Sequence, residues 1–543
     1  MRSEVGGEAM RAEPEQGPAS RPARSRRRTL LAVAAGALQT LAGFAVYLRL
    51  ASTRAVNSDG AGQALQAWAM LHGNPLMRGW RLSDVSFYTT ELPEYMLVEL
   101  GRGLNAGVVH IAAAITYTLA VLFAALVARG SATGREGYLR SGLAVGIMLA
   151  PQLDDGVNVL ISSPDHIGTS VPILLAWLIL DRAGRRWQAA VAVPLLLGVA
   201  VVADELVLYA AVIPIALACG FRVAAALVKR GPVPWFESGL GLGSLACGAI
   251  ALEVLRMINR AGGFYMAAPD AKIAPLGVIM GHNLRLTAEG VLLLFGANFI
   301  NLRSPIDYVF AALHLVGVAL VIGAFLLAVW RWRRTDLVAT ALALGIALNL
   351  LAYLISTAPY FLPTTREIAP VLPLAAALAG RQFGPMLART RASRPAKLAI
   401  PVLALVGVGY LAGLTHEDLQ PTIPAQNASL TSWLATHHLT DGLSGYWEAN
   451  VVALTSGGQV RIRSVTAENG RLIRGTVETD ETWYDPRQYS ANFVVLFPGI
   501  SGYPGFTNSS QTLATFGKPA RTYRFASYTI LVWNKNLLAE LGS

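Results

Sequence analysis

Long apolar segments separated by short clusters of arginine are the feature that most limits what this chain can fold into. Stretches such as Ala32 to Leu48, Gly107 to Val127 and Val309 to Trp330 contain no Asp, Glu, Lys or Arg. Each is long enough to cross the roughly 30 Å of a bilayer core as a helix rising about 1.5 Å per residue. With 54% hydrophobic residues, 14% charged residues and a mean hydropathy of +0.47, the chain is typical of a multi-pass membrane protein.

The arginine clusters predict the orientation of these segments, because loops that stay in the cytoplasm are enriched in Lys and Arg. The polar segment 1–28 ends in such a cluster, and we predict that it is disordered, cytoplasmic and followed by about eleven spanning helices. The predicted spans are 30–50, 105–128, 141–153, 167–181, 187–203, 205–221, 238–256, 307–330, 337–357, 367–384 and 398–415. Together they form a transmembrane domain over residues 29–415.

This orientation places two long loops, 51–102 and 257–306, outside the cytoplasm. Within the second loop, Val291 to Ile300 is apolar but too short to span. We interpret it as re-entrant or interfacial, because a full span there would move every later arginine cluster to the outer face. Arg greatly outnumbers Lys, and Ala, Gly, Leu and Val dominate, which fits a GC-rich bacterium. We therefore predict that the chain lies in the bacterial plasma membrane, with its N-terminus in the cytoplasm.

The odd number of spans also places residues 416–543 outside the cytoplasm. This tail lacks long apolar runs and contains strand-like pieces separated by Gly, Pro, Asn and Asp. The pieces are 451–455, 459–465, 492–497 and 523–533. We predict a soluble extracytoplasmic α/β domain of roughly 120 residues.

Net charge, cysteine content and the absence of common motifs argue against a nucleic-acid-binding protein and against several enzyme classes. The charge of +11 comes from arginines placed between apolar runs rather than along one polar face, so we predict no nucleic-acid partner. The only cysteines, Cys219 and Cys247, lie in apolar segments and are interpreted as small buried side chains. No Gly-rich phosphate loop, His-Glu-x-x-His or Cys-x-x-Cys motif is present.

Asp59 is the first candidate functional residue. It follows the first span after a few residues, so its carboxylate is expected at the membrane surface, where it can act as a general base. A structural alternative is that Asp59 caps the helical run Ala61 to Leu71. Further along the same loop, Glu91 and Glu94 flank Pro93 and either line a site or are solvated loop acids.

The second outer loop gathers possible metal ligands. Asp154 and Asp155 end the third span, and Asp165 and His166 begin the fourth. Oxygen and nitrogen ligands of this kind can hold a divalent metal such as Mg or Mn. The alternative is that Asp165 caps a helix and the others are interface residues.

Two further outer segments carry cationic candidates for substrate binding. Arg366 lies at the outer end of the tenth span, where its guanidinium can grip a phosphate with two hydrogen bonds, or can pair with Glu367. His282 in the long loop is a weaker candidate of the same type. Asp204 and Glu205 join two apolar helices and are interpreted as a short polar turn outside the membrane.

The arrangement resembles the GT-C superfamily of integral membrane glycosyltransferases. It shares an acid in a long first outer loop, acids at the outer end of the third span, a long partly apolar loop after the seventh span, and an outer C-terminal domain. The segments Thr365 to Pro373 and Tyr446 to Asn450 are similar to actinobacterial membrane proteins of this type.

The resemblance implies transfer of a sugar from a polyprenyl-phosphate donor to an envelope glycan, lipid or protein. It implies that Asp59 is the base for an inverting attack, and that Arg366 faces the donor phosphate. Asp154, Asp155 and His166 then lie where some members bind a metal. The first outer loop lacks the adjacent Asp-Glu pair of protein mannosyltransferases, and the chain lacks the Trp-Trp-Asp motif of oligosaccharyltransferases.

A second hypothesis is a non-catalytic envelope protein, or a transporter, with a glycan-binding outer tail. Against a transporter, the predicted spans show no charged pair deep in the bilayer. Nor do they show an inverted repeat of broken helices.

Overall fold

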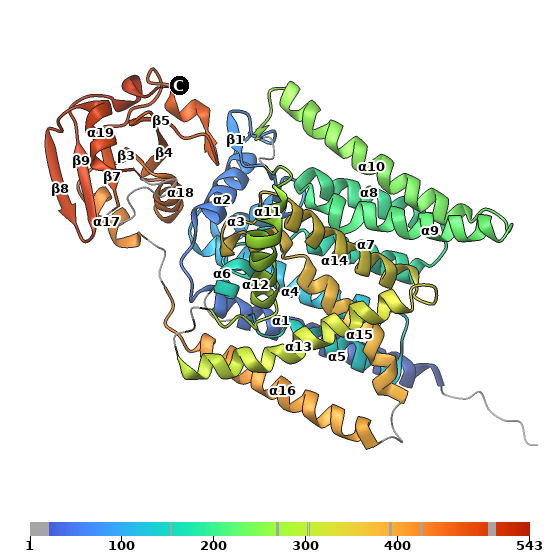
Figure 1. The fold of residues 1–543 in the computed structure, drawn as a ribbon. Helices are drawn as coiled ribbons and strands as arrows, with labels where there is room; N and C mark the ends of the chain where they lie inside the picture. Colours follow the sequence, from blue (N-terminus) through green and yellow to red (C-terminus); the bar gives the residue numbers. More distant parts are fainter. Residues whose placement is uncertain are drawn as a thin grey trace, which may run out of the picture.

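The structure, a computed structural model, describes residues 21–542 apart from 152–154, 268–270, 301, 303, 390–393, 424–426 and 498–506. Within these residues a helix lies at every range predicted to span, and Figure 1 shows these helices packed into one bundle. They are α1 (Arg21–Ala51), α4 (Gly107–Arg129), α5 (Gly134–Met148), α7 (Ser170–Ala183), α8 (Trp187–Ala203), α9 (Ile213–Val228), α10 (Trp235–Arg260), α13 (Pro305–Trp330), α14 (Leu337–Ile355), α15 (Val371–Arg389) and α16 (Arg394–Asp418).

Seven spans in the described residues are long and apolar enough to cross a membrane, which supports a multi-pass membrane protein. They are Val33–Ala51, Gly107–Arg129, Leu208–Val228, Trp235–Arg260, Pro305–Trp330, Leu337–Ile355 and Ile400–Asp418. The total of about eleven spans stays a prediction. Because α1 begins at Arg21, residues 21–28 are helical rather than disordered as predicted, and residues 1–20 lie outside the described residues.

Small residues let the helices of the bundle approach closely. A Cβ atom at Gly380 of α15 would collide with the carbonyl oxygen of Arg140 in α5. In the same way, Gly198 of α8 packs on Cys247 of α10. Close helix contacts through Gly are typical of membrane bundles, where packing rather than burial from water holds helices together.

One buried arginine was not expected from the apolar pattern. Arg381 lies inside α15, and its Nη2 contacts Asp181 Oδ1 at 2.7 Å and Asp336 Oδ2 at 3.1 Å. Asp181 lies near the end of α7 and Asp336 caps α14, so two helix ends meet the interior of α15 at this ion pair. The prediction that the spans carry no charged pair deep in the bilayer stays a prediction, because this ion pair lies where α7 ends and α14 begins.

Short elements fill the connections between the long helices. They are α2 (Ser58–Leu71), β1 (Trp80–Leu82), α3 (Glu91–Arg102), α6 (Asp155–Leu160), the π-helix η1 (Leu208–Val212), β2 (Tyr265–Met266), α11 (Leu276–Val278), the π-helix η2 (Ile279–Asn283), α12 (Leu284–Leu294) and the 3-10 helix η3 (Leu362–Ile368). The apolar stretch Val291 to Ile300 thus begins in the last turns of α12.

The tail builds a six-stranded sheet with the strand order β5-β4-β3-β7-β9-β8. Strand β3 pairs in parallel with β4 and β7, and the other pairs are antiparallel. Its strands are β3 (Asp441–Ser444), β4 (Arg461–Glu468), β5 (Arg471–Arg474), β7 (Phe493–Leu496), β8 (Arg521–Phe525) and β9 (Tyr528–Val532). Its helical elements are α17 (Ala428–Thr436), α18 (Tyr446–Thr455), η5 (Glu481–Tyr484), α19 (Ser509–Phe516) and η6 (Leu537–Glu540).

Two of the four predicted tail strands need correction. Residues 451–455 form the end of helix α18, whose residues 448–454 are all buried. A short apolar run buried on every side has no periodicity that separates strand from helix. Residues 523–533 are not one strand, because β8 and β9 form a hairpin around Ala526, whose φ is 51°.

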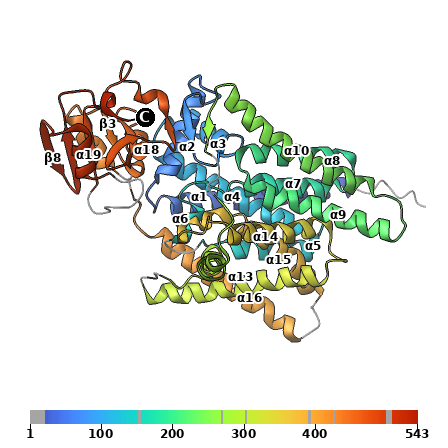
Figure 2. The ribbon, with the colours of Figure 1, turned by 45° about the horizontal axis from the view of Figure 1, so that its top comes forward.

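The tail is joined to the bundle by a second, three-stranded sheet. Strand β1 pairs in parallel with β2 and antiparallel with β6 (Thr479–Asp480) of the tail, with Trp80 opposite Asp480. In Figures 1 and 2 the tail lies beside α2 at one end of the bundle, and α18 packs on α2. This junction brings tail residues next to the first loop.

Candidate active site at the junction of bundle and tail

Helix α2 places Asp59 at the centre of the candidate site. The helix is capped by Asn57, whose Oδ1 accepts a hydrogen bond of 2.8 Å from the backbone N–H of Gly60. The alternative that Asp59 is the cap is therefore wrong, and its carboxylate is free to face other segments. A Cβ at Gly60 would lie 2.7 Å from Val109 Cγ1, so this glycine lets α2 begin directly against α4.

Both carboxylate oxygens of Asp59 are engaged by residues that are distant in sequence. Arg366 of η3 donates from Nη1 to Oδ2 at 2.7 Å. The Tyr446 hydroxyl, at the start of α18, donates to Oδ1 at 2.5 Å. The Arg366 side chain stays 41% exposed, whereas that of Asp59 is 17% exposed. The structure thus brings together two of the predicted site residues, Asp59 and Arg366, and adds Tyr446.

A second carboxyl group, that of Asp165, also lies near the Arg366 guanidinium. Its Oδ2 is 3.9 Å from Arg366 Nη1 and accepts a 2.8 Å hydrogen bond from Ser163, while its Oδ1 accepts from Gln63 of α2. Burial, and next the nearby Asp59 carboxylate, raise the pKa of Asp165 above its usual value. We name Asp59, Asp165, Arg366 and Tyr446 the Asp59 cluster.

His166 is held between two carboxylates beside this cluster. Its Nδ1 lies 3.0 Å from Asp204 Oδ2, and its Nε2 lies 3.5 Å from Glu367 Oε1. Burial alone would lower the pKa of His166, but Glu367 and Asp204 raise it well above the usual value. The residue also has a φ of 47°, a left-handed conformation that costs free energy in a side chain other than glycine.

Glu91 lies buried on the same side of the bundle, at the start of α3. It accepts a hydrogen bond from Thr90, and a Cβ at Gly168 would collide with its carboxylate. Burial is the main cause that raises the pKa of Glu91 to about 8. The structure therefore shows Glu91 as a buried acid near Asp204, and the alternative of a solvated loop acid is wrong.

His282 is placed apart from these contacts. It lies on η2, is exposed, and its Nε2 is 3.1 Å from the carbonyl oxygen of Pro359. The next residue, Asn283, donates to the carbonyl oxygens of Leu354 and Ser356. These contacts hold η2 against the end of α14, and a substrate-binding role for His282 stays a prediction.

The predicted metal ligands are described only in part. Asp154 lies outside the described residues, and Asp155 begins α6 with a side chain that is not described. His166 directs both ring nitrogens at carboxylates, which fits an ion pair and not a metal ligand. Among the described residues no three His, Cys, Asp or Glu side chains are grouped as a metal ion requires. The metal site stays a prediction, and we derive no step through it.

Several residues of the site were not selected from the sequence. Gln63 and Gln66 follow Asp59 by four and seven positions, so they lie on the same face of α2. Gln63 contacts Asp165, and Gln66 contacts Glu478 of the tail. This i, i+4, i+7 spacing is visible in the sequence and indicates one polar face on the helix. Asp204, interpreted as part of a polar turn, is buried and also accepts a 2.5 Å hydrogen bond from Thr169.

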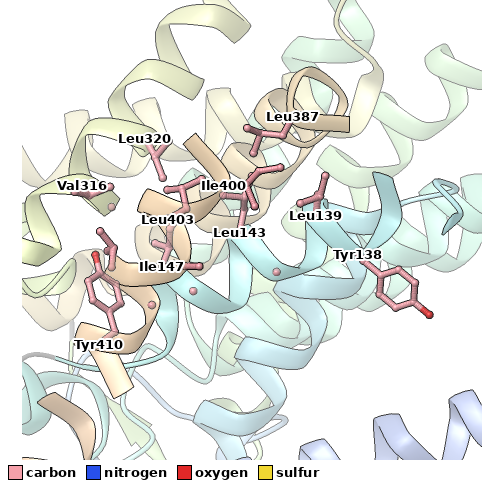
Figure 3. Close-up of a pocket in the computed structure, with 16 residues that line it drawn as sticks. Tyr138, Leu139, Leu143, Ile147, Val316, Leu320, Leu387, Ile400, Leu403 and Tyr410 are labelled. Atoms are coloured by element: carbon pink, nitrogen blue, oxygen red, sulfur yellow. The ribbon is translucent and has the colours of Figure 1, made fainter. Parts of the chain in front are cut away.

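Two larger cavities lie in the described part of the bundle, in addition to a third of about 10 Å³. One of about 310 Å³ is lined by Glu205, Arg256, Arg260 and Tyr265, and Glu205 directly follows Asp204, which contacts His166. The other, of about 250 Å³, lies between α5, α13, α15 and α16 and is lined almost entirely by carbon (Figure 3). The second contains no acid or base, so it does not suit the chemistry of sugar transfer.

Comparison with solved structures assigns the fold. ArnT from Cupriavidus metallidurans bound to undecaprenyl phosphate aligns with a TM-score of 0.54 and 14% identity, over 94% of this chain and 99% of ArnT. ArnT in the apo state aligns with a TM-score of 0.53 and 14% identity, over 96% of this chain and 100% of ArnT. The chain has the GT-C fold.

The GT-C fold confirms the predicted fold class, a helical membrane bundle followed by a sheet-containing C-terminal domain. The oligosaccharyltransferase of Archaeoglobus fulgidus is a weaker match, with a TM-score of 0.47 and 12% identity over 84% of this chain and 69% of that chain. No family model and no curated protein matches the sequence.

Proposed function

We propose that this chain is a membrane glycosyltransferase that moves a sugar from a polyprenyl-phosphate donor to an envelope acceptor outside the cytoplasm. The observation that carries the proposal is the direct contact of Asp59 with Arg366 in a chain with the GT-C fold. One residue is an acid suited to take a proton, and the other is a cation suited to hold a phosphate. Support for the donor class comes from ArnT, whose structure contains undecaprenyl phosphate.

The reaction requires one proton transfer and one exchange of bonds at the anomeric carbon. Asp59 takes the proton of an acceptor hydroxyl, whose oxygen forms the new bond to the anomeric carbon. The bond from that carbon to the phosphate oxygen breaks on the opposite face, so the configuration inverts. The polyprenyl phosphate leaves with the electron pair, and Arg366 neutralises the charge that develops on it.

The Asp59–Arg366 ion pair gives the order in which these groups act. Without donor, the guanidinium occupies Oδ2 of Asp59 at 2.7 Å. A donor phosphate can reach the partly exposed Arg366 and compete for it, since phosphate oxygens accept bidentate hydrogen bonds from arginine. Once the phosphate takes the guanidinium, Oδ2 becomes available to an acceptor hydroxyl. Donor binding therefore frees the base.

The variant Asp59→Asn tests this assignment, because the amide keeps the shape of the side chain and cannot accept the proton. We expect transfer to fall by on the order of a hundredfold or more, to the level of the empty vector. The measurement compares envelope glycans of a strain that lacks the native gene and carries either variant or wild type. In parallel, membranes of that strain, which supply the acceptor, are assayed for release of polyprenyl phosphate from polyprenyl-phosphate-linked hexoses and pentoses.

The matched control is Glu136→Gln, an acid-to-amide change in a surface ion pair with Arg140 on α5. This control should restore the envelope like wild type. Equal rescue by Asp59→Asn and wild type would rule out Asp59 as the base.

A further inference from the structure

We infer that the tail completes the active site, and that Tyr446 is a positioning residue that orients the Asp59 carboxylate. The inference rests on the proposed function, because it concerns the residue proposed as the base. Tyr446 is the first residue of α18, and its hydroxyl donates to Asp59 Oδ1 at 2.5 Å. The two residues are 387 positions apart, so this bond exists only when the tail is docked.

The backbone of Tyr446 is fixed to the same turn of α2. The hydroxyl of Ser58, directly before Asp59, donates to the carbonyl oxygen of Tyr446 at 2.6 Å. Ser58 is fully buried, so its hydroxyl has no water to bond with instead. The start of α18 and the start of α2 are thus linked by a side-chain bond in each direction.

A second contact fixes the tail one to two turns further along α2. Glu478 accepts a hydrogen bond from Gln66, and its backbone carbonyl accepts from Asn450 of α18 at 3.1 Å. A Cβ at Gly62 would lie 2.7 Å from Glu478 Oε2, so the absence of a side chain at Gly62 lets the tail pack closely against α2. Glu478 makes this contact from a left-handed backbone conformation, with a φ of 51°. This conformation costs free energy in a residue other than glycine.

The two oxygens of Asp59 therefore have partners of different kinds. Oδ2 faces the partly exposed Arg366, which a donor phosphate can recruit, whereas Oδ1 faces a neutral hydroxyl anchored in the tail. Burial first, and Asp59 second, raise the pKa of Tyr446 well above its usual value, so the hydroxyl stays a donor. When Arg366 turns to the phosphate, Tyr446 still holds Oδ1 and directs Oδ2 at the acceptor.

The test is the steady-state kinetics of Tyr446→Phe in the polyprenyl-phosphate release assay, with Tyr528→Phe as the matched control. Tyr528 is a buried tyrosine of β9 whose hydroxyl bonds to Asn427, away from Asp59. We expect Tyr446→Phe to lower kcat by about tenfold to a hundredfold, since a misdirected base loses the reactive geometry. Its KM for the donor should stay within about twofold, because Arg366 remains. Tyr528→Phe should leave kcat and KM unchanged.

Two outcomes overturn the inference, and a third separates it from the proposed function. If Asp59→Asn is inactive while Tyr446→Phe is as active as wild type, Tyr446 does not position the base. If Tyr446→Phe and Tyr528→Phe lose the same kcat and the same thermal stability, the hydroxyl of Tyr446 has only a role in folding. Activity retained in Asp59→Asn would instead refute the proposed function on which the inference rests.

Discussion

At the scale of the residue, the site is a set of acidic and basic side chains that pair with one another. Arg366 is shared between Asp59 and Asp165, and His166 between Asp204 and Glu367. Breaking one partner of such a buried set leaves an unpaired charge, which costs more than the pair contributes. The cluster is thus suited to respond to an incoming phosphate, which replaces one partner with another.

The buried carboxyl group of Glu478 should make the stability of the native state depend on pH. Burial, and next Asp59 and Asp165, raise the pKa of Glu478 from 4.5 to about 8. Between these values the native chain keeps a proton that the unfolded chain has released, so the native state loses stability as the pH rises from about 4.5 to about 8. Glu478→Gln is neutral throughout. We therefore expect its Tm to exceed that of wild type by more at pH 8 than at pH 5.

Thermal unfolding of the detergent-solubilised protein across this pH range provides the measurement. Glu468→Gln, at an exposed position of β4, is the control and should follow wild type. A Tm difference that is the same at both pH values would contradict the raised pKa of Glu478.

At the scale of the element, α2 organises the site. Its cap, Asn57, begins the helix so that Asp59, Gln63 and Gln66 share one face. That face meets three separate segments through Asp165, Arg366 and Glu478. Gly62 lies on this face and provides the space for the tail.

Gly62→Ala should therefore separate the tail from α2. The added Cβ would lie 2.7 Å from Glu478 Oε2 and 3.3 Å from Asn450 Nδ2, so these side chains must shift. We expect a loss of about 1–3 kcal/mol in stability, the usual cost of overpacking, together with a lower kcat because Tyr446 moves. Limited proteolysis at the bundle–tail connection and the release assay measure both effects.

The control is Gly101→Ala in α3, where nothing lies within 4 Å of the new Cβ. This change should be neutral or slightly stabilising, since Ala favours helix over Gly. Equal protease resistance of Gly62→Ala and wild type would show that the close approach at Gly62 is not required.

At the scale of the whole molecule, the orientation in the membrane decides which compartment supplies the acceptor. The arginine clusters predict that the tail and the Asp59 cluster lie outside the cytoplasm. Alkaline phosphatase fused to the C-terminus should therefore be active, and the same enzyme fused after Arg230 should be inactive. The reverse pattern would place the site in the cytoplasm and exclude the proposed envelope acceptor.

Much of the architecture could be predicted because its physical cause is local. An apolar run of about 20 residues has few alternatives to a spanning helix, and helices are present at each predicted range of the described chain. The tail strands were harder to predict, because residues 451–454 are all buried in α18 and carry no helical periodicity.

Some residues of the candidate site could be selected from the sequence, and others could not. Asp59, Arg366 and His166 could be selected because each lies at the outer end of a predicted span and has a side chain that suits a base, a phosphate-binding cation or a metal ligand. Tyr446 was noted only within the segment Tyr446 to Asn450, and Glu478 was not noted, because the residues around them in the sequence do not indicate contacts several hundred positions away. His282, selected from its loop alone, instead contacts the backbone carbonyl of Pro359.

The sequence by itself determined a multi-pass membrane chain with a sheet-containing tail and a small group of candidate charges. These follow from hydrophobicity, charge placement and turn residues, which act over a few neighbouring positions. Only the tertiary structure decided which charges meet, that Asn57 rather than Asp59 caps α2, and that the tail reaches Asp59. Those outcomes depend on how α2, η3 and α18 pack, and packing is set by contacts between segments that are far apart in the chain.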